Sequence, residues 1–551
     1  MYKNIILISL ALSFQVSAKL PNNPAISSAH PLATAAGLEI LAQGGNAFDA
    51  AIAVSAVLTV VEPESSGIGG GGFWLLHDVS KNKNIMVDAR EKAPAAAHRD
   101  MYLDKNGDVN RDLAVNGPLS SGIPGTVAAM EHIANNYGKL TLAQSLAPAI
   151  KIASEGFTLP NKFVRGLASK KEFMSRYPAS MKAFYVNGKD TPEHGHLLIQ
   201  KDLAKTLKAI AKHGRVGFYQ GKIAKKFVKA VREAGGIWTL DDLKNYNVVE
   251  REPIYTSYRG KQLITSPPPS SGGIALATML NILSGWDLAD MKDDRRVHLV
   301  VEAMRRAYRD RSIHLGDPDY FDVPVSKLVH PFYADGIRAS IREDKTMPSD
   351  QLPGLAHLQE GTDTTHFSII DTQGNLVATT QTVNTVFGSK FVAAGTGVLL
   401  NNEMDDFSAK PGESNAYGLI GGEANSIQPG KRPLSSMTPT FVIGDDDVAV
   451  LGTPGGSRII TMVMLGILDY FDGNSVDSWT AVPRYHHQYM PDILFYEPGA
   501  ISAESIPALE ARGHKLKELQ HTWGNMNAAS WNKKTGETKA ATDPRGEAAI
   551  R

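Results

Sequence analysis

The bond between Asp363 and Thr364 offers an unusual chemistry. It lies in the stretch "GTDTTHFSIID", residues 361–371, where two threonines precede a strand-like alternation. A threonine hydroxyl is a poor nucleophile without an adjacent base, and its own α-amine can be that base once the preceding bond is cut. An α-amine has a pKa of roughly 7.7–8 and can exchange a proton near neutral pH. The plainer alternative is that both threonines are β-branched strand formers.

A predicted hairpin places a second hydroxyl beside Thr364. The stretch "TTHFSIID-TQG-NLVATTQTVN" alternates on both sides of Gly374, which supplies the turn residue. With a three-residue loop at 372–374, facing residue numbers sum to 746, and Thr364 faces Thr382. A loop that differs by one residue places Thr364 beside Val383 instead. Asn384 follows on the same face as Thr382.

Other nucleophiles and nucleotide sites find little support. The chain has no cysteine, which excludes disulfides and a thiolate nucleophile, and it has no G-x-S-x-G motif. Ser80 and Lys83 match S-x-x-K, but they lie in a charged loop without the companion motifs. Gly67, Gly69 and Gly72 match G-x-G-x-x-G, yet a buried helix precedes them and a strand follows, the reverse of a dinucleotide site. Close backbone packing is the better interpretation.

We expect no metal and no cofactor. His298 and Glu302 lie four residues apart on a predicted helix, but a lone pair of this kind is more often a local hydrogen bond. The cluster "EHGH" at 193–196 lies in a loop, and the neighbouring histidines of "YHHQ" at 485–488 point to opposite faces of a strand. No third ligand at convincing spacing accompanies His486 and His487.

Size and charge limit the function. The chain has 551 residues, with Lys+Arg and Asp+Glu balanced at 57 each, so nothing indicates nucleic-acid binding. Residues 1–18 read as a signal peptide: Lys3, the apolar run "IILISLALSF" and "VSA" before the cleavage point. A membrane anchor is the alternative, but the run is short for a span, and no later stretch is long enough. We therefore expect a periplasmic or secreted protein without a membrane span.

The elements that must position Thr364 come from both sides of it. Residues 25–61 read as helix–turn–helix, with Asn46 capping a second helix that is apolar all round. Helical sequence fills roughly 125–250 and continues from residue 297. Residues 340–363 read as an exposed connector, and strands dominate from residue 364 onward.

Several motifs together resemble the γ-glutamyltransferase family of N-terminal-nucleophile hydrolases. They are "DTTHFSIID", "TVNTVFGS", "GTGVLLNNEMDDFSAKPG", "KRPLSSMTPT" and "GTPGGSRII", with "MVDAREKAP" and "PPPSSGG" earlier in the chain. The resemblance covers nearly the whole mature chain. It implies an α/β fold, a four-layer αββα sandwich, and self-cleavage before Thr364. The products would be a large subunit, 19–363, and a small subunit, 364–551, that stay associated.

The resemblance also assigns roles. Thr364 would be the nucleophile, Thr382 its hydrogen-bonding partner, and Gly455 and Gly456 the backbone donors to the oxyanion. The substrates would be glutathione and other γ-glutamyl compounds, with water, amino acids or dipeptides as acceptors. The two charged ends of the glutamyl group would be held by Arg90, Ser435 and Ser436 for the carboxylate, and by Asn384, Glu403 and Asp406 for the ammonium.

One loop has a predicted role, and two alternative functions are compatible with parts of the sequence. Residues 411–422 resemble the lid loop of bacterial family members, with Tyr417 over the glutamyl site; an ordinary polar loop is the alternative. A related acylase that cleaves glutaryl-cephalosporin side chains is the nearest rival, although such substrates lack the ammonium that Glu403 and Asp406 would bind. The other rival is a non-catalytic exported glutamyl-binding protein, which would need no chain cleavage.

Overall fold

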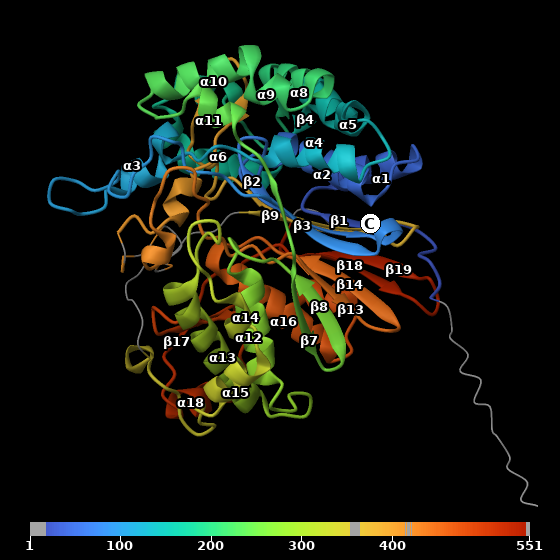
Figure 1. Ribbon diagram of the computed structural model, residues 1–551, viewed down its shortest axis with the longest axis vertical. Coiled ribbons are helices and arrows are strands. Elements are labelled where there is room, and N and C mark those ends of the chain that lie inside the picture. Colours follow the sequence, from blue (N-terminus) through green and yellow to red (C-terminus); the bar gives the residue numbers. More distant parts are fainter. Residues whose placement is uncertain are drawn as a thin grey trace, which may run out of the picture.

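A computed structural model describes residues 18–352, 364–410, 412–413, 415, 419 and 421–546. Two six-stranded sheets lie face to face, with helices covering the outer face of each (Figure 1). Neighbouring strands are antiparallel throughout both sheets. The predicted α/β fold, a four-layer αββα sandwich, is confirmed.

The first sheet contains the predicted hairpin. Its order is β1-β9-β10-β2-β3-β6. The strands span Ala25–Ser28 (β1), Thr365–Ile370 (β9), Leu376–Thr382 (β10), Gly71–Asp78 (β2), Lys83–Ala89 (β3) and Val249–Arg251 (β6). The two strands that follow residue 364 therefore lie between strands that precede it.

The second sheet mixes the two parts of the chain in the same way. Its order is β19-β18-β14-β13-β8-β7. The strands span Thr538–Thr542 (β19), Asn527–Asn532 (β18), Asp447–Gly452 (β14), Thr440–Ile443 (β13), Lys261–Thr265 (β8) and Ile254–Tyr258 (β7). Because both sheets combine strands from before and after residue 364, neither part carries a complete sheet.

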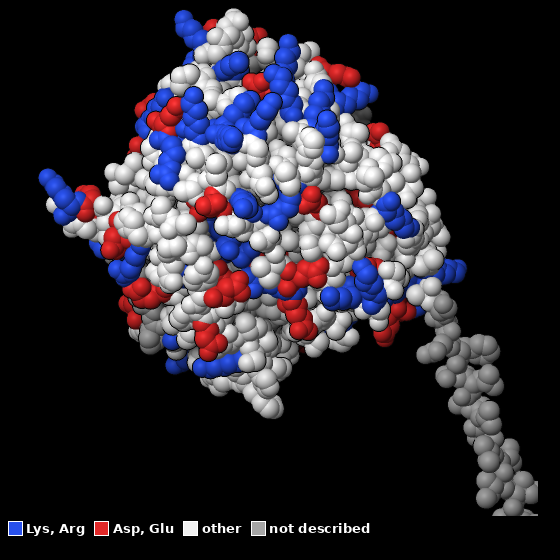
Figure 2. Space-filling view, turned by 45° about the horizontal axis from the view of Figure 1, so that its top comes forward, with Lys and Arg blue, Asp and Glu red and all other residues white. Residues whose placement is uncertain are grey.

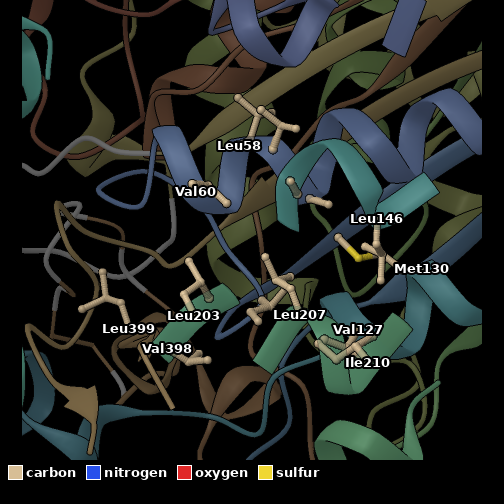
Figure 3. Close-up of a cluster of buried hydrophobic side chains, with 14 of the residues drawn as sticks. Leu58, Val60, Val127, Met130, Leu146, Leu203, Leu207, Ile210, Val398 and Leu399 are labelled. Atoms are coloured by element: carbon tan, nitrogen blue, oxygen red, sulfur yellow. The ribbon is translucent and has the colours of Figure 1, made fainter. Parts of the chain in front are cut away.

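Helix α2, Ala47–Val61, is the centre of the layer on the first sheet. Every residue of α2 is buried, and Asn46 caps it as predicted, in a capping box with Asp49. Figure 3 shows side chains of this layer converging on one apolar cluster. The other main helices of the layer are α1 (Pro31–Ala42), α4 (Thr126–Asn136), α5 (Leu142–Glu155), α6 (Asn161–Met174), α7 (Pro178–Phe184), α8 (Lys201–His213), α9 (Val216–Tyr219) and α10 (Gly221–Glu233).

The layer on the second sheet is built around α13, Asp293–His314. This helix packs with α12, Gly272–Leu283, and α12 packs with α16, Ile459–Phe471. Their apolar side chains join the second sheet in a second core cluster. The smaller helices on the side of the second sheet are α14 (Val325–Leu328), α15 (Pro331–Arg338), α17 (Val476–Ala481) and α18 (Ser505–Ala511).

The two sheets meet through polar as well as apolar side chains. The Asn527 Nδ2 atom of β18 donates to the carbonyl of His366 on β9 at 3.0 Å. Ser368 Oγ donates back to the carbonyl of Asn527 at 3.0 Å, and Ser27 Oγ of β1 donates to Asn527 Oδ1 at 2.9 Å. These buried bonds fix the position of β9, and therefore of Thr364, relative to the second sheet.

Two expectations about the elements were wrong. Residues Ala25–Ser28 are not helical but form β1, because they pair with β9 along the sheet edge. The stretch from residue 340 is not simply exposed: Thr346 and Ser349 are buried, because both hydrogen-bond to charged side chains of α13. The glycines at 69–72 do pack closely, since a Cβ on any of them would collide with neighbouring backbone or side-chain atoms.

Other expectations fall on segments without a description. The predicted signal peptide (except for Ala18), Asp363 and Tyr417 lie outside the described residues. Within the described part of the chain, no helix has the length and apolarity that a membrane crossing requires.

Candidate active site

The β9–β10 hairpin has the predicted register. Ile370 faces Leu376, and Thr365 faces Gln381, so facing numbers sum to 746. The next pair is Thr364 with Thr382, whose hydroxyl oxygens lie 3.5 Å apart. Asn384 begins the following turn, where its backbone N–H donates to Thr382 Oγ1 at 2.7 Å. The three-residue loop is therefore confirmed.

The two neighbouring threonines occupy different environments. Thr364 lines a pocket, whereas Thr365 Oγ1 donates to Glu62 Oε2 at 2.7 Å, at the C-terminal end of α2. Successive side chains of a strand point to opposite faces, so only one of the two can face the pocket. The Thr364 side chain is therefore the one that lines the pocket, and the Thr365 hydroxyl is bonded to Glu62.

The pocket brings most of the predicted site residues together. Its free volume is about 20 Å³, and its lining includes Arg90, Thr364, Thr382, Asn384, Glu403, Asp406, Ser435, Ser436 and Gly456. Gly455 adjoins Gly456 without lining the pocket. Residues separated by more than 300 positions therefore meet in one small space. Sequence reasoning missed the apolar wall of Leu419, Met437 and Ile459.

Buried charges are concentrated at Arg90. Its guanidinium contacts the carboxylates of Glu403 and Asp406, the latter at 2.5 Å, and lies 3.6 Å from Glu91. Arg90 also donates to the carbonyl oxygens of Pro433 and Leu434 at 3.1 and 3.3 Å. Sequence reasoning placed Arg90 against one end of a ligand and the two acids against the other. In this structure the cation and the acids are paired with each other.

Burial dominates the protonation of this cluster. Desolvation raises the pKa of Glu403 well above its usual range, although the charge of Arg90 opposes the shift. Desolvation likewise raises the pKa of Glu91 to about 7, again against the effect of Arg90. A zwitterionic ligand fits such a site electrostatically. Its carboxylate can replace Glu403 and Asp406 at the Arg90 guanidinium, while its ammonium forms ion pairs with these two carboxylates.

The glycine-rich loop positions the residues on either side of the pocket. Asn401 Nδ2 donates to the carbonyl of Gly69 at 2.8 Å, and Asn401 Oδ1 accepts from the backbone N–H of Glu403 at 3.0 Å. Asn384 has a left-handed backbone with φ of +79° and donates from Nδ2 to the carbonyl of Asn402 at 2.9 Å. Asparagine tolerates this conformation better than most residues.

The two serines rest on the loop "PPPSSGG", residues 267–273. Ser435 donates its backbone N–H to the carbonyl of Pro269 at 2.8 Å and accepts at its own carbonyl from Ser271 Oγ at 2.7 Å. Loops distant in sequence therefore form one wall. Through this contact the motif "PPPSSGG", which precedes residue 364, supports the pocket, although the pocket's threonine and serine hydroxyls belong to residue 364 and later residues.

Gly455 and Gly456 lie at the start of a helical segment. A 3₁₀ turn, Gly456–Arg458, leads directly into α16. The first N–H groups of a helix lack internal acceptors and favour negative charge. Gly455 has φ of +141° and Gly456 has φ of +57°, conformations that favour glycine. The arrangement suits a developing oxyanion.

The His298–Glu302 pair acquires a third neighbour, His514, but remains a hydrogen-bonded network. His298 Nδ1 lies 2.7 Å from His514 Nε2. Glu302 already has cationic partners, with Arg306 Nη1 at 2.6 Å and Arg305 Nε at 3.2 Å. These guanidinium groups compensate the carboxylate and disfavour an additional cation. His298 and Glu302 therefore take part in a buried network of hydrogen bonds and ion pairs.

We expect Glu302→Gln to destabilise the fold by about 3 kcal/mol at pH 7, because Arg305 and Arg306 lose a buried counter-charge. Despite desolvation, the two arginines lower the pKa of Glu302 from 4.5 to about 2. A depressed carboxyl pKa contributes stability above pH 4.5 that is lost as the pH falls toward 2. Urea unfolding at several pH values should show the difference between the two proteins shrinking over that range. A difference independent of pH would contradict this account.

Comparisons with known proteins agree with the geometry. The family described as Gamma-glutamyltranspeptidase matches residues 33–551. A glutathione hydrolase proenzyme of Pseudomonas sp. (strain A14) is 43% identical, covering 90% of this chain and 86% of its own length. The glutathione hydrolase proenzyme of Escherichia coli (strain K12) is 42% identical, with 94% and 90% covered.

A solved structure shares the complete architecture. The crystal structure of cephalosporin acylase from Bacillus halodurans superposes with a TM-score of 0.86 and 27% identity, covering 100% of this chain and 99% of that chain. The family match spans nearly the whole chain, and the identities over most of its length exceed 40%. The chain therefore belongs to the γ-glutamyltranspeptidase family of enzymes.

Proposed function

We propose that this protein is a self-processing γ-glutamyltransferase with glutathione hydrolase activity. It transfers the γ-glutamyl group of glutathione and related amides to water, or to amino acid and dipeptide acceptors. The observation that carries the proposal is the pocket itself, in which the Thr364 hydroxyl lies near Thr382 and shares one small space with a buried cation and two acids. No cofactor takes part in the proposed reaction.

The proposed processing yields two chains. Residues 1–18 are removed on export to the periplasm, and cleavage between Asp363 and Thr364 gives a large subunit, 19–363, and a small subunit, 364–551. The interleaved strands of both sheets support continued association of the subunits. The word "proenzyme" in the names of the two relatives supports a precursor.

The proposed chemistry begins with the amine that cleavage releases. The α-amine of Thr364 takes the proton of its own hydroxyl, and Oγ1 attacks the γ-carbonyl of the substrate. Backbone N–H groups of Gly455 and Gly456 stabilise the oxyanion, with each donor contributing roughly 2.7–4 kcal/mol in comparable sites. Thr382 holds the hydroxyl in place. The intermediate then collapses, the C–N bond of the γ-amide breaks, and the Thr364 ammonium gives its proton to the leaving amine. Water or an acceptor amine attacks the resulting ester and releases the Thr364 hydroxyl.

The proposed binding residues hold both ends of the glutamyl group. They are Arg90, Ser435 and Ser436 for the α-carboxylate, and Asn384, Glu403 and Asp406 for the α-ammonium. Holding both ends aims the γ-carbonyl at Thr364, which is catalysis by positioning. Tyr417, in the loop at 411–422, is proposed to cover the site; Leu419 of the same loop lines the pocket and supports this.

We expect a γ-glutamyl anilide to be hydrolysed with a kcat/KM roughly 10⁴-fold above that of a glutaryl anilide. The glutaryl group lacks the ammonium, so Glu403 and Asp406 would be left without their partner. Steady-state kinetics with both substrates, together with glutamate release from glutathione, measure the difference. Equal rates, or faster glutaryl cleavage, would favour the cephalosporin acylase that the superposed structure represents.

A further inference from the structure

The first inference concerns Arg311, a cation beside the pocket that the proposed mechanism does not use. Arg311 is 5% exposed and lies on α13. Its Nε donates to Ser271 Oγ at 3.0 Å, and its Nη2 donates to Ser436 Oγ at 3.4 Å. Among the described residues no carboxylate forms an ion pair with it. A buried guanidinium without a counter-ion is costly unless one arrives.

The charges around the pocket show where that counter-ion would come from. Arg90 contacts Glu403 and Asp406 and lies near Glu91, so these carboxylates compensate its charge. Burial lowers the pKa of Arg311 to about 10, which leaves it protonated at neutral pH. An anion at Ser436 would therefore meet a cation directly behind that serine.

Contacts of helix α13 fix the position of Arg311 beside Ser271 and Ser436. Three residues earlier, the Tyr308 hydroxyl donates to the carbonyl of Ser457, in the 3₁₀ turn that Gly456 begins. The same helix thus contacts the turn proposed for the oxyanion and the serines proposed for the carboxylate. The sequence does contain a signal for Arg311: it is a positively charged residue on the face of α13 that packs against the core, the same face as Met304 and Tyr308.

We propose that Arg311 is a positioning residue for the substrate α-carboxylate. It orients the hydroxyl of Ser436 and, through Ser271, the backbone of Ser435, and it supplies the charge that balances the carboxylate. This inference rests on the proposed function, because it assigns the anionic end of the ligand to these serines.

The test compares substrates with and without the charge. Replacing the α-carboxylate of a γ-glutamyl anilide by a carboxamide should lower the kcat/KM of the wild type by about 100-fold. In Arg311→Met that preference should shrink about ten-fold, through KM, because Arg90 remains as a cation for the carboxylate. Arg311→Lys should keep more of the preference. An equal loss of both substrates in Arg311→Met would show that Arg311 only supports the loops, and would overturn the proposal.

A binding measurement separates this inference from the proposed function. Calorimetry with L-glutamate and its α-carboxamide needs no turnover. A wild type that cleaves no γ-glutamyl compound would refute the proposed function, and the calorimetry would still measure the contribution of Arg311. If wild type and Arg311→Met bind glutamate equally, or if neither binds it, the proposal for Arg311 is wrong.

A second, independent observation is a basic surface on α8 and α10. Residues 201–233 contain ten Lys and Arg but two Asp and Glu, in a chain whose total charge is balanced. The apolar faces of both helices are buried, so the lysines form exposed stripes on the outer layer. Figure 2 shows blue side chains gathered over this part of the molecule. The stripes comprise Lys201, Lys205, Lys208 and Lys212 on α8, and Lys222, Lys225, Lys226 and Lys229 on α10.

The spacing of these lysines opposes folding. Within each stripe they recur three or four residues apart, where like charges repel on a helix. Acidic partners are few: Asp202 lies 3.0 Å from Lys205, and Glu233 lies 3.8 Å from Lys229. Amphipathic folding accounts for charged residues on these faces but not for their single sign, which suits an external polyanion.

We infer that this basic surface binds the anionic headgroups of a phospholipid bilayer. Two adjacent helices present an extended charged surface rather than a pocket, which suits a planar array of phosphates. Their apolar faces are occupied by the core, so the contact is electrostatic and does not require insertion. An exported protein meets such a surface at the membrane that it has crossed.

The test uses the processed protein and vesicles of phosphatidylcholine with or without phosphatidylglycerol. We expect the protein to sediment with vesicles that contain phosphatidylglycerol and not with vesicles of phosphatidylcholine only. High salt should abolish this sedimentation. Reversing Lys208, Lys212, Lys222 and Lys225 to Glu should weaken binding at least about ten-fold. The matched control reverses four exposed lysines of the other layer: Lys292, Lys345, Lys515 and Lys517. Equal effects of the two variants, or binding to heparin but not to vesicles, would overturn the inference.

Discussion

Thr364→Ala should yield one uncut, folded chain without γ-glutamyl activity. The substitution removes the hydroxyl needed for cleavage, and without cleavage the α-amine of residue 364 remains an amide that cannot act as a base. The structure predicts little damage to the fold, since the Thr364 side chain faces a pocket rather than the core. Denaturing electrophoresis would show a single band, and an anilide assay would show loss of turnover to background.

Two variants control this experiment. Thr364→Ser keeps a hydroxyl and should still be processed. Thr365→Ser keeps the hydrogen bond to Glu62 and should be cut before residue 364. N-terminal sequencing of the small chain identifies the cut. A small chain that begins at residue 365, or efficient cleavage of Thr364→Ala, would show that the roles of the two threonines are assigned wrongly. One intact band from folded, mature wild type would refute self-cleavage and support the non-catalytic rival.

Arg90→Met should lower both activity and stability. We expect kcat/KM to fall about 1,000-fold, as for two charge-assisted hydrogen bonds of roughly 1.5–3 kcal/mol each. The free energy of unfolding should also fall by about 3–5 kcal/mol, because Glu403 and Asp406 lose a buried counter-charge. Kinetics with a γ-glutamyl anilide and urea unfolding measure the two effects.

The comparison with Arg90→Lys separates charge from geometry. Lysine keeps a positive charge but lacks the planar fork that reaches two carboxylates and two carbonyl groups. It should recover part of the stability and little of the activity. Unchanged kcat/KM in Arg90→Met would contradict a role for this residue in substrate binding.

Local pattern was enough for several features. Alternation and Gly374 predicted the hairpin and limited its register to two choices, and Asn46 predicted the start of α2. These features depend on residues close in sequence, so periodicity and turn chemistry specify them. The residues of the pocket were named through family resemblance, and neither composition nor spacing could have joined Arg90 to Glu403.

The wrong expectations share a cause. Ala25–Ser28 form a strand because β9 lies beside them, and Thr346 is buried because Glu302 accepts its hydrogen bond. Both outcomes depend on partners far away in the sequence, which no local window contains. Arg311 was not identified from the sequence for the same reason, because its significance depends on its hydrogen bond to Ser436.

The sequence by itself determined that a threonine could follow a cleavable bond, that a second threonine would lie near it, and that the protein could use neither cysteine nor a serine elbow. Only the tertiary structure distinguished the environments of the two threonines, with Thr364 lining the pocket and Thr365 donating to Glu62. It also placed Arg90 in direct contact with the two acids, Glu403 and Asp406. Strand alternation fixes that neighbours point apart, but which face is the pocket depends on how two sheets and their helices pack.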